Sequence, residues 1–319
     1  MIDEFIAKAN SYGKSGIPFF FAVDFDVKNF IISSNPKEIL YDIDGLRNYE
    51  PIKKDNKFKI TLNPQYIDFA TYKRAFERVI EEIKKGNTYL LNLTFETKLD
   101  NDLDLEKIFF NSDARYKLYI KNRLICFSPE RFIKITGNKI ETHPMKGTID
   151  AKVPNAKEKI LNDPKEMSEH LMVVDLLRND LSMVSKRVRV EKYRYIQKIK
   201  AGKKELLQVS SKITGQLDED WREKIGEILI KILPAGSITG TPKRKTVELI
   251  NKIENYKRGF FTGVFGYFDG QNLDSAVLIR YIEKRGDEFF FKSGGGVTLM
   301  SDAKKEYEEL KDKVYVSLF

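Results

Sequence analysis

Residues 260–292 read FFTGVFGYFDGQNLDSAVLIRYIEKRGDEFFFK, and this stretch indicates the fold class. Its apolar runs predict three consecutive strands, Phe260–Phe268, Leu273–Glu283 and Glu288–Lys292, separated by short segments containing glycine, asparagine or aspartate. Strands that follow one another directly are typical of antiparallel sheets, whereas strands that alternate with helices are typical of parallel ones. The stretch therefore favours an α+β protein with antiparallel sheets over a doubly wound parallel sheet.

The rest of the chain repeats this grouping of strands. The segment before Pro64 is expected to hold strands and loops, with strands at Pro18–Phe25 and Lys57–Leu62. Thr88–Glu96 is also expected to be a strand. Further strands are predicted at Arg131–Ile135 and Lys139–Thr142, which form a hairpin around Gly137-Asn138, and at Val188–Ile196 and Leu206–Leu217.

Helices are indicated by their ends and by apolar residues at helical spacing. A helix from Thr71 to the stop at Gly86 carries its apolar face on Tyr72, Phe76, Val79, Ile80 and Ile83. Asp163-Pro164 combines an N-cap with a proline at the first helical position and begins a helix to about Asp180. Thr241-Pro242 opens another helix to about Glu254, and Ser301 or Asp302 caps a last one. No linker interrupts the sequence, so residues 1–319 are expected to form one domain.

Composition argues against several classes of protein. The 56 lysines and arginines outnumber the 47 aspartates and glutamates, but the lysines are scattered among acidic residues, as in Lys304-Lys305-Glu306. A solvated lysine-rich surface explains this better than nucleic-acid binding. The single Cys126 excludes an internal disulfide framework, and the apolar run Ile17–Val23 is too short to span a membrane. The N-terminus has no basic signal-peptide region, so a cytoplasmic protein without a nucleic-acid or membrane partner is expected.

Two predicted helices carry pairs of glutamates. Glu166 and Glu169 are three residues apart on the first, and Glu306 and Glu309 repeat this spacing on the last, with Lys313 one turn further. Such spacing places both carboxylates of a pair on one helix face. Carboxylate oxygens are what Mg²⁺ requires, although pairs of this kind are usually ordinary surface residues. Nothing local in the sequence shows that the two helices meet.

Two further segments carry chemically active side chains. Pro144-Met145-Lys146-Gly147-Thr148 places one lysine in a turn whose Gly147-Thr148 backbone can approach a small acid, so Lys146 is a candidate buried nucleophile. Glu130 follows the apolar strand Leu124–Phe127, where burial would raise its pKa and suit it to general acid catalysis. The alternative for Glu130 is a salt bridge to Arg131.

Two glycine-containing segments and one arginine suit anion binding. The loop Gly236–Lys243 ends at a helix N-terminus, but Pro242 and its spacing argue against a nucleotide-binding loop. Ser293–Gly296 lets backbone approach a ligand, or forms a tight turn. Arg280, on a predicted strand, can pair bidentately with a carboxylate, or it bridges two strands.

Together these segments resemble the chorismate-utilising enzymes, which include anthranilate synthase component I, aminodeoxychorismate synthase component I, isochorismate synthase and salicylate synthase. The segments that carry the resemblance are Ser128–Phe132, Pro144–Thr148, Glu169–Asp180, Gly236–Lys243, Ile279-Arg280 and Gly294–Lys313. It covers residues 65–319, with residues 1–64 as N-terminal strands of the same chorismate-binding domain. It implies the anthranilate-synthase-component-I-like fold, in which large antiparallel sheets pack as a sandwich with helices outside.

Lys146 selects one branch of the family. Anthranilate synthases carry alanine in the corresponding turn, whereas aminodeoxychorismate synthases carry lysine. The resemblance therefore implies transfer of glutamine amide nitrogen to chorismate, giving 4-amino-4-deoxychorismate for 4-aminobenzoate and folate. The chain has no Cys-His-Glu glutaminase set, so a separate amidotransferase subunit is expected to supply ammonia.

The resemblance also implies a role for each site residue. Glu169 and Glu309 hold Mg²⁺, while Glu166 and Glu306 act through water. Lys146, uncharged because burial and neighbouring cations lower its pKa, adds at C2, and Glu130 protonates the departing C4 hydroxyl. The substrate is bound by Arg280, which holds the enolpyruvyl carboxylate, by backbone groups of Gly147, Thr148 and Gly294, and by the nearby Thr239 and Lys313.

The sequence departs from the family pattern at three places. Gln208 replaces a frequent histidine near the substrate, Leu90 replaces a glutamine, and Phe261 replaces an aromatic residue that is often tyrosine. A lysine in place of Leu90 activates water in isochorismate- and salicylate-forming relatives, so Leu90 argues against those activities. Three alternatives remain: an anthranilate synthase component I, a non-catalytic chorismate-binding paralogue and a basic nucleic-acid-binding protein.

Overall fold

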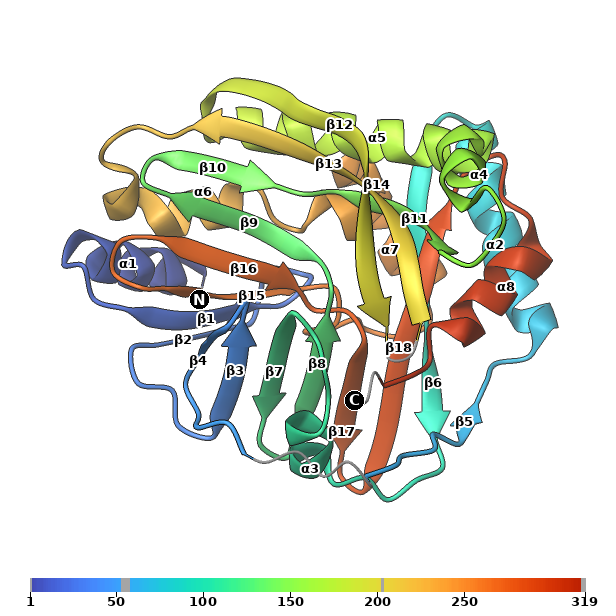
Figure 1. Ribbon diagram of the computed structural model, residues 1–319, viewed down its shortest axis with the longest axis horizontal. Helices are drawn as coiled ribbons and strands as arrows, with labels where there is room; N and C mark the ends of the chain where they lie inside the picture. The colour runs from blue at the N-terminus through green and yellow to red at the C-terminus, as the bar shows by residue number, and fades with distance from the viewer. Residues whose placement is uncertain (1, 53–57, 202–203, 317–319) are drawn as a thin grey trace.

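The computed structural model describes residues 2–52, 58–201 and 204–316. Within these residues the chain forms two large antiparallel sheets with helices around them (Figure 1). The strands of one sheet run across those of the other, as in sandwiches whose sheets pack orthogonally. This architecture confirms the predicted α+β class and the sandwich of antiparallel sheets.

The first sheet, sheet A, has the strand order β11-β13-β10-β9-β16-β15-β1-β2, and β12 pairs with β13 outside this path. Its strands are β1 (Phe19–Val23), β2 (Phe30–Ser33), β9 (Arg131–Thr136), β10 (Lys139–Thr142), β11 (Met145–Asp150), β12 (Lys186–Ala201), β13 (Lys204–Gln216), β15 (Val264–Phe268) and β16 (Leu273–Val277). Because β1 lies between β15 and β2, the N-terminal segment is built into the sheet.

The second sheet, sheet B, has the order β14-β6-β18-β17-β8-β7-β3-β4, and β5 pairs with β6. Its strands are β3 (Ile39–Ile43), β4 (Leu46–Arg47), β5 (Pro64–Gln65), β6 (Leu90–Leu99), β7 (Tyr116–Ile120), β8 (Leu124–Ser128), β14 (Gly240–Thr241), β17 (Tyr281–Arg285) and β18 (Glu288–Val297). The core between the sheets includes Phe20 and Phe265 from sheet A and Tyr41, Cys126 and Tyr281 from sheet B.

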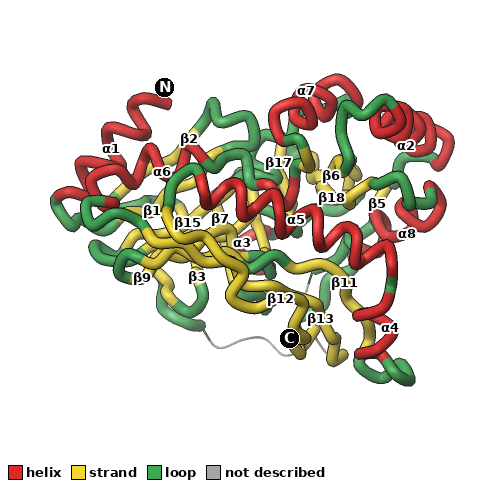
Figure 2. Tube along the Cα trace, turned by 90° about the horizontal axis from the view of Figure 1, so that it is seen from above, coloured by secondary structure: helices red, strands yellow, loops and turns green. Residues whose placement is uncertain are grey.

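The helices lie on the outside, with α1 and α6 at one end of the molecule and α2 and α8 at the other (Figure 2). They are α1 (Ile2–Lys14), α2 (Phe69–Lys84), α3 (Leu105–Phe110), α4 (Ala156–Asn162), α5 (Pro164–Ser182), α6 (Ile225–Lys231), α7 (Lys243–Ile253) and α8 (Ala303–Asp312), with 3₁₀ turns at η1 (Trp221–Lys224) and η2 (Gly236–Ile238). In the described part of the chain, none of them is long and apolar enough to cross a membrane.

Three of the predicted helix ends are confirmed, whereas α2 begins at Phe69, capped by Asp68, and not at Thr71. Asp163 caps α5 by accepting a hydrogen bond from the Glu166 amide at 3.0 Å. Asp302, rather than Ser301, caps α8. Gly86 follows α2 with φ of +75°, in the left-handed region that favours glycine. The hairpin of β9 and β10 also forms as predicted.

The expectation of only strands and loops before Pro64 is wrong, because α1 occupies Ile2–Lys14. Its Phe5 and Ala9 are buried one helical turn apart, against sheet A and α6. Asp3 and Glu4 in its first turn stabilise the helix, because their negative charges lie near the positive end of its dipole. The strand predicted at Lys57–Leu62 is absent from residues 58–62, and Lys57 lies outside the described residues.

The predicted strand Leu273–Glu283 is two strands in different sheets. The chain leaves sheet A after Val277 and enters sheet B at Tyr281. At the break, the Thr262 amide donates to the Leu278 carbonyl at 2.8 Å, and Arg280 has φ of +55°. A nearly continuous apolar run hid this break, because only Asp274, Ser275 and Arg280 are polar between Leu273 and Ile282.

The packing of α1 predicts that Phe5 supports the whole domain. Its ring is fully buried and lies edge-on to Phe21 and Phe30, with ring centroids 6.3 and 5.5 Å away. We expect Phe5→Ala to lower the free energy of unfolding by about 3–5 kcal/mol, through lost burial and the cavity that remains. Urea denaturation measures this, with the exposed Ile17→Ala as control. A change under about 1 kcal/mol would show that α1 is not part of the folded unit.

Candidate active site

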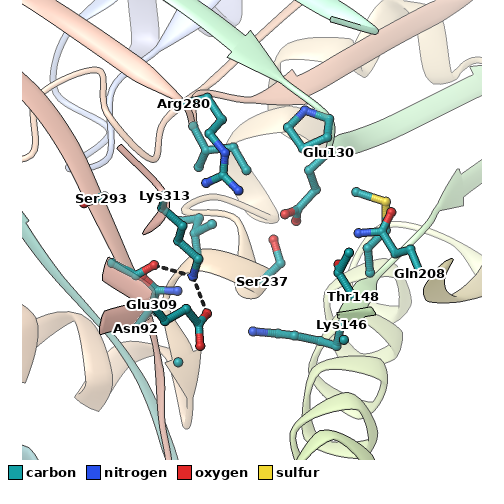
Figure 3. A pocket seen from close by; sticks show the side chains of 18 of the residues that line it. Asn92, Glu130, Lys146, Thr148, Gln208, Ser237, Arg280, Ser293, Glu309 and Lys313 are labelled. Atoms are coloured by element: carbon teal, nitrogen blue, oxygen red, sulfur yellow. Dashed lines mark hydrogen bonds and ion pairs between the residues drawn. The ribbon is translucent and has the colours of Figure 1, made fainter. Parts of the chain in front are cut away.

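A cavity of about 820 Å³ opens where sheets A and B part, between α5 and α8. The side chains that converge in it come from β11, β13, β18, α5, α8 and the segments after β8 and β16 (Figure 3). Of the residues predicted for the site, those that line it are Glu130, Lys146, Gly147, Thr148, Glu166, Glu169, Arg280, Gly294, Glu306, Glu309 and Lys313. The two glutamate pairs therefore meet in space, which the sequence alone did not show.

Lys146 lies on an irregular part of β11, and its side chain reaches the cavity from there. The pairing of β11 with β13 shifts register between Lys146 and Thr148, and Gly147 within this bulge has φ of +78°. A bulge bends a strand and re-aims its side chains. A Cβ on Gly147 would lie 3.1 Å from a carboxylate oxygen of Glu166, so glycine also lets α5 approach.

The cations that were expected beside Lys146 are not its nearest charged neighbours. Burial alone lowers the pKa of its ammonium group, but the carboxylates that face it outweigh this effect, and the pKa is raised. The first of them is Glu169, whose Oε2 lies 3.5 Å from Lys146 Nζ. The neighbours expected to lower the pKa were cations, whereas the nearest charged groups are anions.

Three glycines of β18 allow the charged side chains to crowd against sheet B. A Cβ on Gly294 would lie 2.2 Å from the Leu93 carbonyl oxygen, so the pairing with β6 requires glycine there. At Gly296 a Cβ would lie 3.3 Å from Glu169 Oε2 and 3.4 Å from Lys146 Nζ. Larger side chains at these positions would occupy the space that the helix glutamates and Lys146 use.

The glutamate pairs surround a lysine that the sequence analysis missed. Lys165 Nζ lies 2.6 Å from Glu306 Oε1 and 3.5 Å from Glu169 Oε1, and so joins α5 to α8. Burial opposes its charge, but the pairing with Glu306 raises its pKa. The sequence signal that could have identified Lys165 is its position next to Glu166, because the first turn of α5 faces the cavity.

The glutamates of α5 and α8 offer the oxygen donors that a hard cation such as Mg²⁺ prefers. In the described residues, Glu169 Oε1 and Glu306 Oε1 are buried and make no hydrogen bond of good geometry. Burial raises the pKa of Glu166, and the nearby Glu169 charge raises it further. No group of three or more acidic, histidine or cysteine side chains in the described residues already encloses a metal position. Mg²⁺ commonly takes only one or two protein carboxylates, so the residues fit it.

Glu130 points into the cavity (Figure 3). Arg131 instead pairs with Asp274 and Asp44, at 2.8 and 2.7 Å, which removes the salt bridge that was its alternative. Burial raises the pKa of Glu130, although Ser237 and then Lys146 oppose the shift. A carboxyl group with a raised pKa can carry a proton near neutral pH.

Two cations occupy the side of the cavity opposite Lys146 (Figure 3). Lys313 Nζ donates to the Gly294 carbonyl at 2.7 Å and lies 2.6 Å from Glu309 Oε1. Burial lowers its pKa, and Glu309 opposes this. Arg280 follows the break between β16 and β17, and its backbone carbonyl accepts from the Phe127 amide at 3.1 Å.

Thr239 does not reach the cavity, which corrects its predicted role in substrate binding. Its hydroxyl donates to the carbonyls of Ala235 and Gly236, at 3.0 and 3.1 Å, and is fully buried. The same loop instead presents Ser237 and Ile238. Sequence reasoning could not show this, because the hydrogen bonds that hold the Thr239 hydroxyl depend on the local turn around η2.

The remaining lining residues include two of the departures from the family pattern. Gln208 and Phe261 line the cavity, while Leu90 is buried beside Gly296. Lys292 and Tyr315 also line it and were not predicted. Neither histidine of the chain is among the lining residues.

Comparison with known proteins shows similarity along most of the chain. Residues 26–318 match the chorismate binding enzyme family. A Haemophilus influenzae protein described as an uncharacterised PabA-like protein is 46% identical over 99% of this chain and 97% of its own length. Aminodeoxychorismate synthase component 1 of Bacillus subtilis is 30% identical over 76% of this chain and 54% of that protein. Anthranilate synthase component 1 of Archaeoglobus fulgidus is 31% identical over 76% and 60%.

The chain belongs to the chorismate binding enzyme family, as the sequence motifs predict. Its fold is shared with a crystal structure of anthranilate synthase component I from Streptococcus pneumoniae, with a TM-score of 0.68 and 24% identity over 82% of this chain and 62% of that one. The chain spans little more than half of the B. subtilis relative. Identity to the two named synthases is nearly equal, so the reaction has to be argued from the site.

The loop that carries Ser237 is held by a buried ion pair, and we expect its loss to be costly. Lys243 Nζ lies 2.5 Å from Asp180 Oδ1, and neither side chain is more than 17% exposed. Lys243→Met should lower the free energy of unfolding by about 3–5 kcal/mol, because it leaves Asp180 charged and unpaired. Adding Asp180→Leu should recover most of this loss in urea denaturation. Lys245→Met, at an exposed pair on the same helix, is the control. Equal stability of wild type and Lys243→Met would contradict the assignment.

Proposed function

We propose that this protein converts chorismate and ammonia to 4-amino-4-deoxychorismate, a step toward 4-aminobenzoate and folate. The observation that carries the proposal is the side chain of Lys146, which projects into a cavity shared with Glu130, Arg280 and the glutamates of α5 and α8. An amine at this place can act as a nucleophile toward the substrate ring. The alanine of anthranilate synthases has no such group.

The residues divide the chemistry between them. Lys146 Nζ forms a bond to ring carbon C2, the ring double bond shifts, and the C4 hydroxyl leaves as water with a proton from Glu130. Ammonia then attacks C4, the double bond shifts back, and the C2–nitrogen bond to Lys146 breaks, which releases the lysine as the neutral amine that entered the reaction. The new ammonium group on C4 returns one proton to Glu130. Two such displacements return the new nitrogen to the carbon that lost the hydroxyl. The net change is chorismate plus ammonia to 4-amino-4-deoxychorismate plus water.

Substrate anions would be held from two sides. Arg280 can bind the enolpyruvyl carboxylate through the edge of its guanidinium group, with Lys313 nearby. Backbone amides of Gly147, Thr148 and Gly294 lie along the wall. Beyond Lys292, β18 pairs only with β6 in the described residues, so its other edge faces the cavity without a strand partner.

Glu169 and Glu309 would hold Mg²⁺, with Glu166 and Glu306 acting through water. When bound there, the cation would anchor the ring carboxylate and offset the anions that raise the pKa of Lys146. The ammonium group of Lys165, which lies between Glu169 and Glu306, would have to move to make room for the cation. Ammonia would come from a separate glutamine amidotransferase subunit, consistent with the component naming of the B. subtilis relative.

We expect the wild-type protein to form 4-amino-4-deoxychorismate from chorismate, Mg²⁺ and ammonium at mildly alkaline pH, and Lys146→Ala to lose this product by roughly 10³-fold or more. Chromatography with mass detection separates it from the 2-amino product of an anthranilate synthase. Lys152→Ala, at an exposed lysine beyond the same strand, is the control. Full C4 amination by Lys146→Ala would reject the nucleophile, and 2-aminobenzoate from the wild type would reject the reaction.

We expect Glu169→Gln and Glu309→Gln each to weaken divalent cation binding by about 100-fold or more, because each removes a charged oxygen donor. Mn²⁺ binding by electron paramagnetic resonance measures this without turnover, and Mg²⁺ titration of activity provides the comparison. Glu308→Gln is the matched control, since Glu308 lies on α8 but is half exposed and pairs with Lys311. A chelator-treated wild type with undiminished activity would exclude the metal.

A further inference from the structure

The segment after α8 places an aromatic ring on the arginine of the cavity. The Tyr315 ring centroid lies 5.3 Å from the Arg280 guanidinium carbon, within the range of a cation–π contact. Tyr315 also lines the cavity and is 42% exposed. It is therefore neither a core residue nor remote from the proposed substrate.

The residues beside Tyr315 explain why it faces the cavity. Val314 and Val316 are partly buried and pack against the cluster below sheet B that includes Phe127 and Phe291. Tyr315 lies between them, and its amide donates to the Lys313 carbonyl at 3.1 Å in a tight turn. The two valines thus anchor the segment on either side of Tyr315, whose ring lies against Arg280 instead.

Arg280 needs such a neighbour, because little else in the described residues fixes its side chain. No carboxylate of these residues lies within ion-pair distance of it, and its buried Nε makes no hydrogen bond there. Arg131, Arg258 and Arg285, by contrast, all pair with acidic side chains. An unpaired arginine at a cavity wall is free to bind an anion, but it loses rotamer entropy when it does so.

We propose that Tyr315 is a positioning residue for the substrate carboxylate that Arg280 binds, an inference that rests on the proposed function. The ring covers one face of the guanidinium group and leaves its N–H edge open to a bidentate carboxylate. By holding the group in place before the substrate arrives, the ring lowers the ordering cost of binding. The C-terminal segment thereby completes the carboxylate side of the cavity.

The test compares Tyr315→Leu, which removes the ring, with Tyr315→Phe, which keeps it. Tyr315→Leu should raise the KM and Kd for chorismate about tenfold while kcat changes much less, since cation–π contacts are worth a few-fold to about 30-fold in binding. Tyr315→Phe should recover most of that loss. Tyr89→Leu, at an exposed tyrosine outside the cavity lining, is the control. Thermal unfolding of each variant excludes a folding defect.

A double-mutant cycle shows whether Tyr315 acts through Arg280. In an Arg280→Gln background, Tyr315→Leu should weaken chorismate binding no further. An equal loss in both backgrounds, or no loss in the wild-type background, would overturn the inference. Kd is measured by equilibrium dialysis without ammonia, so it does not depend on the product formed. If the wild type makes another product but the coupling persists, the proposed function fails and this inference stands; a wild type that does not bind chorismate overturns both.

Discussion

The site depends on the change of sheet at residues 278–280. If Leu273–Glu283 were one strand, β17 would continue beside β18 and cover its glycine-rich end. Because the chain instead crosses from sheet A, the pairing with β18 ends at Tyr281 and Lys292. The sheets part there, and the cavity occupies the opening. The crossing also requires Arg280 to adopt a left-handed backbone conformation, which costs roughly 1–3 kcal/mol in a residue with a side chain. Conformations of this kind are concentrated at functional sites.

The second constraint is charge balance. Four glutamates and Glu130 face a cavity that also holds Lys146, Lys165, Lys313 and Arg280. Removing any of these charges from water is costly unless an opposite charge stands close by. The pairs of Lys165 with Glu306 and of Lys313 with Glu309 supply such compensation. Glycines at the facing wall supply the space, because side chains there would separate the charges from one another.

Much of the fold and most of the site follow from local sequence signals. Asp163-Pro164 and Asp302 mark helix starts because capping is a local interaction. Lys146 could be singled out because the turn around it has unusual composition. The break at Arg280 could not be predicted, since strand exchange between sheets depends on tertiary packing and leaves the apolar pattern unchanged. The carboxylates around Lys146, which raise its pKa, were also beyond the sequence, because they come from distant parts of the chain.

That convergence gives a physical reason to propose a dication at this site. Chorismate carries two carboxylates, and Arg280 with Lys313 can receive one of them. The other would approach the side lined by Glu166 and Glu169, where burial and then the Glu169 charge already raise the pKa of Glu166. Two unit charges 4 Å apart repel by about 4 kcal/mol at an effective dielectric constant of 20. A cation held by the same glutamates would reverse the sign of this interaction. It would also weaken the field that favours the ammonium form of Lys146, so substrate binding and formation of the nucleophilic amine would depend on the same charge.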